Sequence, residues 1–92
     1  MAIVEISQAA FAALPQIDQC CHLWKSENER AWFADASARS AGVLLYNPDT
    51  KLWGYCICLG SDDGKYARVA VAVDIPTADM ARLELIAEMR KL

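Results

Sequence analysis

Residues 42–60, with the sequence GVLLYNPDTKLWGYCICLG, decide the fold of this chain. Two apolar runs flank the NPD sequence at residues 47–49, a combination typical of a type I turn. The stretch therefore predicts a β-hairpin. With a loop of three residues, Tyr46 would pair with Leu52, and alternation along the strands would put six large side chains on one face of the sheet. These six are Val43, Leu45, Trp53, Tyr55, Ile57 and Leu59.

One position conflicts with a loop of that length. Thr50 would need a left-handed backbone conformation, which costs a β-branched residue about 1 kcal/mol or more. A longer loop, with the first strand slipped relative to the second, is the competing arrangement.

The sequence beyond the hairpin continues the antiparallel meander. Residues 60–65 have the Gly, Ser and Asp content of a turn, and residues 66–74 form a third strand. If Leu59 opposes Ala67, alternation along the strand brings its valines onto the face that carries the large side chains.

The N-terminal part of the chain predicts one helix. Ser7 stands at the N-cap position of a helix over residues 8–14, and Pro15 ends it because proline cannot continue the hydrogen-bond ladder. Residues 3–6 are either a small strand or the lead-in to that helix. Residues 16–28 could hold a helical turn or a strand, and the sequence does not decide between them.

A further strand over residues 31–36 would place Trp32 and Phe33 on opposite sides of the sheet. At the other end of the chain, Thr77 is a good N-cap for a helix whose apolar stripe would cover the large-residue face. The stripe consists of Ala78, Ala81, Leu85, Met89 and Leu92. We therefore expect one α+β domain over residues 1–92, an antiparallel meander of three to four strands with an N-terminal and a C-terminal helix.

Composition narrows the possible partners. Of the 92 residues, 55% are hydrophobic, more than one modest core needs, so we expect a partner protein or a second copy of the chain. The net charge of −3 and the dispersed Lys and Arg disfavour nucleic-acid binding. Residues 1–7 lack the pattern of a signal peptide and no apolar run reaches membrane-spanning length, so we expect a cytoplasmic protein that does not enter membranes.

The second face of the predicted sheet is the candidate partner-binding site. Small and weakly polar residues dominate it, whereas a face in contact with water should carry Thr, Lys, Glu or Arg. The last helix adds apolar residues away from its core stripe. The candidate residues are Leu44, Tyr46, Leu52, Gly54, Cys56, Cys58, Arg68, Ala70, Ala72, Met80 and Leu83.

The residue pattern points away from catalysis. Four cysteines without an export signal predict reduced thiols. A metal site would use Cys20, Cys21, His22, Cys56 and Cys58, but neither cysteine pair has the spacing of a zinc knuckle. His22 is the one histidine and lies far from Cys56 and Cys58 in the sequence, and a cysteine nucleophile needs a base. We predict no catalytic residue, metal or cofactor.

The sequence thus favours a small non-enzymatic protein-binding module, either an accessory or an inhibitory protein acting on a larger partner, with a homodimer as one possible form. The alternative is a metal- or small-ligand-binding protein that uses the cysteines and His22, or a pocket lined by tryptophan. The tryptophans available for such a pocket are Trp24, Trp32 and Trp53.

Overall fold

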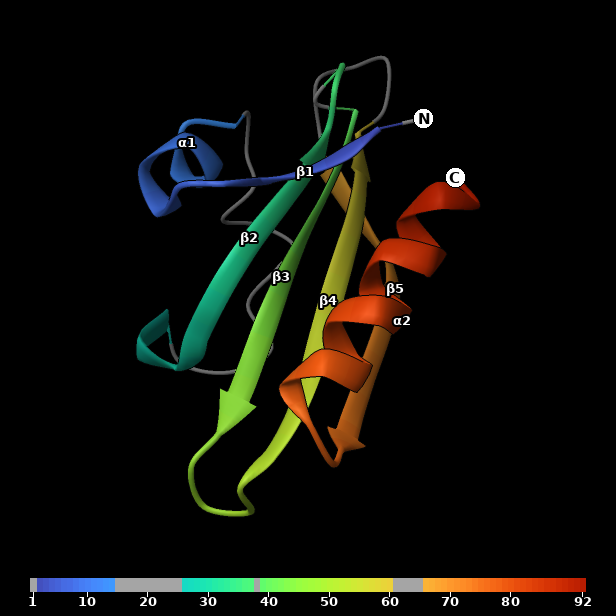
Figure 1. The fold of residues 1–92 in the computed structure, drawn as a ribbon. Helices are drawn as coiled ribbons and strands as arrows, with labels where there is room; N and C mark the ends of the chain where they lie inside the picture. The colour runs from blue at the N-terminus through green and yellow to red at the C-terminus, as the bar shows by residue number, and fades with distance from the viewer. Residues whose placement is uncertain (1, 15–25, 38, 61–65) are drawn as a thin grey trace.

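A five-stranded antiparallel sheet organises the protein in its computed structural model, with the strands in the order β1-β2-β3-β4-β5 (Figure 1). The structure describes residues 2–14, 26–37, 39–60 and 66–92. Its elements are β1 (Ile3–Ile6), α1 (Gln8–Ala12), the 3-10 turn η2 (Ser26–Asn28), β2 (Glu29–Asp35), β3 (Ser40–Asn47), β4 (Leu52–Gly60), β5 (Tyr66–Ile75) and α2 (Ala78–Arg90). The expected α+β class with an antiparallel sheet and a C-terminal helix is confirmed.

Two details of the expected architecture are wrong. The sheet has five strands and not three to four, because the N-terminal segment pairs with β2 as a strand, with Ile3 opposite Asp35 and Ile6 opposite Trp32. The N-terminal helix is short and ends at Ala12, before the predicted Leu14. The ambiguous residues 16–25 lie outside the described part of the chain.

Each helix begins where a side chain can cap it. The Ser7 hydroxyl accepts a hydrogen bond from the Ala10 backbone N–H at 3.1 Å, and the Thr77 hydroxyl accepts one from the Met80 N–H at 3.2 Å. Both predicted N-caps are confirmed, and each satisfies a backbone donor that has no partner inside the helix. Within the described residues, neither helix has the length and apolar character needed to cross a membrane.

The central hairpin adopts the competing, longer loop. Tyr46 pairs with Trp53 and Asn47 with Leu52, so the first strand is slipped by one residue relative to the predicted pairing of Tyr46 with Leu52. The left-handed position falls on Lys51, with φ 60°, and the β-branched Thr50 escapes that strain. The three-residue loop is therefore wrong, for the reason that Thr50 indicated.

This slip divides the residues of the hairpin between two cores, one on each face of the sheet. The α2-side core lies beneath α2 and comprises Ala31, Phe33, Leu44, Tyr55, Ile57, Ile75, Ala81, Leu85 and Met89. The α1-side core comprises Phe11, Ala41, Val43, Leu45, Cys56 and Cys58. Trp32 packs against the α1-side core and Phe33 belongs to the other, so their predicted placement on opposite sides is confirmed.

Gly42 lets α2 lie close to the centre of the sheet. A Cβ atom at this position would stand 3.1 Å from the Met89 sulfur and 3.3 Å from Leu85 Cδ2. Leu85 and Met89 are both fully buried, so the stripe predicted for the last helix faces the sheet here. A side chain at residue 42 would compete with both for the same space.

Candidate interaction surface at the sheet edge

Strand β5 departs from the predicted register after its first pairs. Leu59 opposes Ala67 as expected, but irregularities in the pairing bring Ala70 opposite Ile57 and Ala72 opposite Tyr55. A β-bulge places two residues of one strand opposite one of its partner, which reverses the side chains that follow. The alanines of β5, and not its valines, therefore face the α2-side core.

The valines of β5 are consequently exposed. Val69, Val71 and Val73 have exposed fractions of 45%, 42% and 45%. Val71 pairs with Cys56, a residue of the α1-side core, so Val71 lies on the sheet face opposite α2. An alternating Val-Ala sequence fits either face equally well, so the exposure of these valines could not be predicted from it. The useful signal is that alanine suits the space beneath a closely packed helix better than valine does.

β5 also lies at an edge of the sheet. It is the last strand of the order among the described residues, it spans 10 residues, and no proline interrupts it. One side of an edge strand presents backbone N–H and C=O groups that another strand can pair with, and long apolar edges are typical sites of such pairing. Exposed valines and an accessible backbone therefore coincide on one element.

The residues of the predicted partner-binding face do not share one surface. Leu44, Gly54, Cys56 and Cys58 are buried, and Leu44 lies on the opposite side of the sheet from Cys56. The half-buried members are Tyr46, Leu52, Ala70 and Ala72. The exposed members are Arg68, Met80 and Leu83. The idea of one small-residue face is thus corrected, and partner binding stays a prediction for the accessible members.

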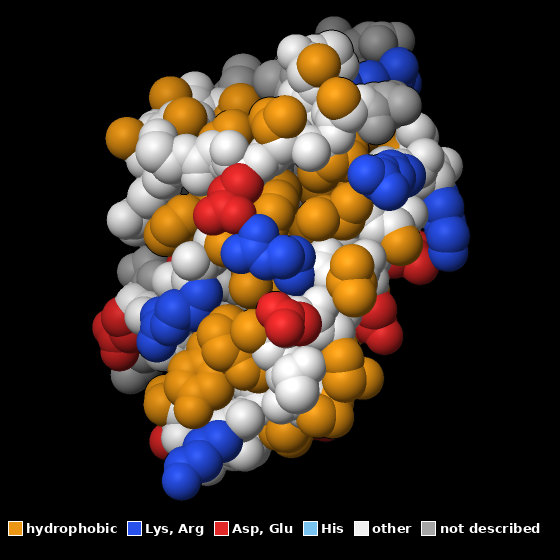
Figure 2. Space-filling view, viewed as in Figure 1, with side chains coloured by type: hydrophobic (Ala, Val, Ile, Leu, Met, Phe, Trp, Pro, Cys, Tyr) orange, Lys and Arg blue, Asp and Glu red, His pale blue; other side chains and the backbone are white. Residues whose placement is uncertain are grey.

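The outer surface of α2 is more mixed than the β5 edge. Met80 and Leu83 are 47% and 70% exposed. On this side of the molecule, hydrophobic side chains alternate with charged ones of both signs, and a larger hydrophobic group lies near the β3–β4 turn (Figure 2). In the strands that lead into that turn, the rings of Tyr46 and Trp53 stand 4.8 Å apart and Arg30 lies over Tyr46. Both rings therefore already contact neighbouring side chains of the same chain.

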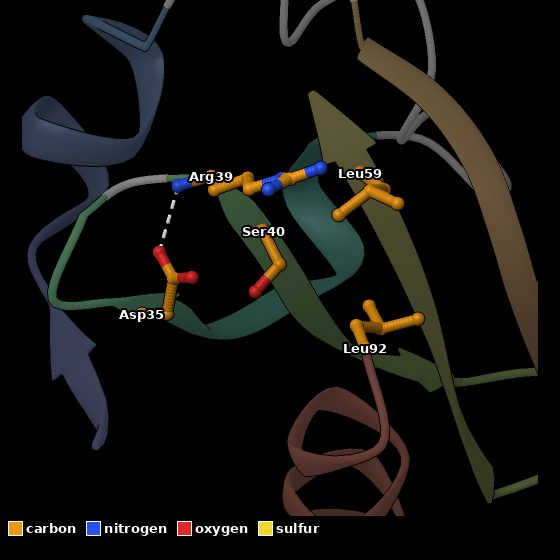
Figure 3. Close-up of a pocket in the computed structure, with 5 residues that line it drawn as sticks. All are labelled: Asp35, Arg39, Ser40, Leu59 and Leu92. Atoms are coloured by element: carbon orange, nitrogen blue, oxygen red, sulfur yellow. Dashed lines mark hydrogen bonds between the residues drawn. The ribbon is translucent and has the colours of Figure 1, made fainter. Parts of the chain in front are cut away.

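A pocket of about 150 Å³ lies where the β2–β3 connection approaches the C-terminal residue (Figure 3). Asp35 is buried there, and its carboxylate accepts hydrogen bonds from the Arg39 backbone N–H at 2.7 Å and from the Ser37 hydroxyl at 3.3 Å. The Ser40 hydroxyl is buried, has no hydrogen-bond partner among the described residues and points toward Asp35. The Asp35 carboxylate therefore already holds the β2–β3 connection in place. This structural role explains why an acidic side chain is buried here.

The pocket is a weak candidate for the ligand-binding alternative. Its volume falls below the ~300 Å³ at which sites for small organic molecules begin. Neither described tryptophan, Trp32 or Trp53, lines it, and Trp24 lies outside the described residues. Trp53 packs against the α2-side core, and the Trp32 indole N–H donates to Glu29 at 2.7 Å.

The cysteines differ from their predicted state. Cys56 is a buried thiol, as expected, but Cys58 is disulfide-bonded, so the prediction of four reduced thiols is wrong. The other cysteine of this bond lies outside the described residues. A disulfide sulfur is not the thiolate that zinc needs, which removes Cys58 from the candidate ligands. Cys20, Cys21 and His22 are not described.

No group of three or more potential metal-ligating side chains occurs in the part of the chain that the structure describes. The disulfide also bears on location, because such bonds persist mainly in oxidising compartments. One argument for a cytoplasmic protein is thereby lost, and that location stays a prediction.

Tyr55 belongs to the α2-side core, and the fold changes the ionisation of its phenol. Burial raises the pKa of its phenol above the ordinary value of 10.0. The carboxylates of Glu84 and Glu88 raise this pKa further, and Lys91 acts in the opposite direction. A phenol held in its neutral form does not act as a base near neutral pH.

Comparison of the chain with protein-family models, with curated proteins and with solved structures finds no match in any of the three.

Proposed function

We propose that this protein is a small non-enzymatic binding module that recognises another protein chain, as an accessory or inhibitory partner, by adding a strand along β5. The observation that carries the proposal is the coincidence of an accessible strand edge with the exposed side chains of Val69, Val71 and Val73. In strand addition, backbone hydrogen bonds supply affinity and alternate side chains supply specificity.

The outer side chains of α2 support the proposal in a secondary way. Met80 and Leu83 are exposed residues in the first half of α2, which follows β5 after Pro76 and Thr77. A partner larger than a single strand could contact both elements. Their mixed surroundings suit the rim of an interface better than its centre.

A non-enzymatic role is proposed for two reasons drawn from described groups. The buried Asp35 carboxylate is engaged by the β2–β3 connection, and the raised pKa of Tyr55 keeps its phenol neutral. Neither a carboxylate engaged in this way nor a neutral phenol serves as a general base near neutral pH.

Photo-crosslinking from the two sheet edges would test the proposal. A photoreactive phenylalanine analogue would replace Val71 on β5 and, as the matched control, Val4 on β1, which is 48% exposed. After irradiation in cells of the source organism, adducts are resolved by mass. We expect a discrete protein adduct from residue 71, absent or at least tenfold weaker from residue 4.

A competing variant makes the result specific. With the analogue at residue 71, Val69→Lys should reduce the adduct, because it places a charge in the apolar stripe without touching a core residue. Absence of any protein adduct from residue 71, whether with another protein or with a second copy, would refute the proposal. Equal adducts from residues 4 and 71 would refute it too.

A further inference from the structure

Strand β5 is complementary to itself. Counted outward from Val71, it carries matching residues in the two directions, namely Ala70 and Ala72, then Val69 and Val73, then Arg68 and Asp74. We propose that β5 pairs antiparallel with β5 of a second copy about a two-fold axis at Val71, so that the two sheets join into one. This inference rests on the proposed function, because it names the occupant of the same edge.

The apolar contacts of this pairing use the exposed stripe. Val71 would lie opposite Val71 of the second copy, and Val69 opposite the second copy's Val73. Directly opposed β-branched side chains in an antiparallel pair stabilise the pairing. All three valines are more than 40% exposed in the single chain, so each has surface to bury.

Charge makes a second copy a better occupant than an arbitrary strand. In this register Arg68 stands opposite Asp74 of the second copy, and symmetry produces the same pair again at the other end. Opposite charges across a strand pair are favourable and like charges are unfavourable. An unrelated strand would need an acidic and a basic residue at these same two positions.

The irregularities of β5 fall on the two sides of the proposed axis. Bulges on an edge strand normally discourage pairing. Here the register shifts fall on either side of the segment 70–72, one at Val69 and one at Val73 and Asp74. About a two-fold axis at Val71, the register shift at Val69 would face the register shift at Val73 and Asp74 of the second copy.

The position of α2 on one face of the sheet is compatible with the joining of two sheets through β5. Two-fold pairing through an edge keeps both copies of α2 on the same face of the combined sheet. α2 packs against β3, β4 and β5, and Figure 1 shows it in front of β4 and β5, on one face of the sheet. Val71 lies on the other face, so α2 does not cover it.

Light scattering coupled to size-exclusion chromatography would measure the assembly. We expect wild-type protein at ~100 µM to have twice the chain mass of 10.1 kDa. Val71→Lys places two like charges directly opposite each other and should weaken dimerisation at least tenfold. Val4→Lys, the matched change on the other edge, should leave the mass of the dimer unchanged.

Cysteine crosslinking would test the register. Val71→Cys should form an intermolecular disulfide under mild oxidation, because opposed Cβ atoms in an antiparallel pair lie within ~5.5 Å. Val69→Cys alone should not, whereas a mixture of Val69→Cys and Val73→Cys should. Mass spectrometry of the linked peptides separates these bonds from those of the natural cysteines.

The outcomes separate this inference from the proposed function. A monomeric wild-type protein whose residue 71 still crosslinks to a different protein overturns the self-pairing and leaves the proposed function standing. A dimer that survives Val71→Lys, or that crosslinks through Val69→Cys alone, overturns the self-pairing as well. A monomer with no adduct at residue 71 overturns both.

Discussion

β1 and β5 are the two edge strands of the described sheet, and they differ in how well their backbone is protected from pairing with another strand. β1 spans 4 residues, and its Glu5 carboxylate forms an ion pair with Arg82 of α2 at 2.6 Å. β5 spans 10 residues and exposes a stripe of three valines. Short length and charge protect an edge from pairing, whereas length and apolar side chains invite it.

The two edges also lead into helices of unequal size. β1 is followed by Ser7 and the 5-residue α1, and β5 is followed by Thr77 and the 13-residue α2. The longer helix anchors the end of the longer edge to the α2-side core. The difference shows that a helix can anchor an exposed edge strand while the outer edge of that strand remains available for pairing.

A change at the centre of the sheet should have the largest effect on stability and should leave the contrast between the edges intact. We expect Gly42→Val to lower the free energy of unfolding by about 1–3 kcal/mol, because it overpacks the space that Met89 and Leu85 occupy. Urea denaturation would measure this. Val4→Ala, at an exposed position, should change it by less than about 0.5 kcal/mol. Equal stabilities of the two variants would contradict the close packing of α2.

The caps that follow the two edges allow a direct comparison. Thr77→Ala removes the acceptor for the Met80 N–H and should cost about 1 kcal/mol of unfolding free energy. Ser7→Ala removes the equivalent acceptor in α1 and should cost less, because α1 is short and contributes only Phe11 as a buried residue. Chemical denaturation of both variants gives the order. A larger loss for Ser7→Ala would mean that α1 and not α2 anchors the sheet.

Removing the charge that covers β1 should have a smaller effect. Arg82 pairs with Glu5 and also lies 5.2 Å from the centre of the Phe33 ring, and both contacts are partly exposed to solvent. We expect Arg82→Ala to cost about 0.5 kcal/mol, less at high salt. Arg82→Lys, which retains the charge, should recover part of it. A loss that does not depend on salt would assign the effect to packing and not to the ion pair.

The smallest effect concerns pH. Because the folded state raises the pKa of Tyr55, its contribution to stability is complete below the ordinary value of 10.0 and is lost as the pH rises through the raised value. Tyr55→Phe removes this dependence. The variant should therefore lose less stability than the wild type between pH 8 and pH 11, as followed by thermal unfolding. Parallel loss in both proteins would show that Tyr55 ionises as freely as an exposed tyrosine.

The elements of the fold followed from the sequence more readily than their registers did. Thr77, the apolar stripe of α2 and the hairpin turn each have a local chemical cause, so they could be predicted from neighbouring residues. The register of β3 against β4 depended on one unfavourable residue, Thr50, and the better solution was visible as an alternative. The register of β5 depended on bulges, which have no signal in an alternating Val-Ala sequence.

The exposed valines of β5 could not be predicted for the same reason. A single bulge reverses which side chains face the core, and the predicted stripe of core valines became the exposed stripe. Arg68, Met80 and Leu83 were identified correctly as lying outside the core, because a charge or a position off the helical stripe marks them individually. Val69, Val71 and Val73 carry no such individual mark.

The ion pair on β1 also determines how far assembly could proceed. Pairing through β5 uses the same edge on both molecules, so the joined sheet would end in a β1 strand at each side. Both ends would then be short and would carry Glu5 held by Arg82. An assembly with identical, protected ends closes at two copies and does not grow into a filament. In the proposed dimer, the charge at one edge would therefore limit the stoichiometry that the valines at the other edge would make possible.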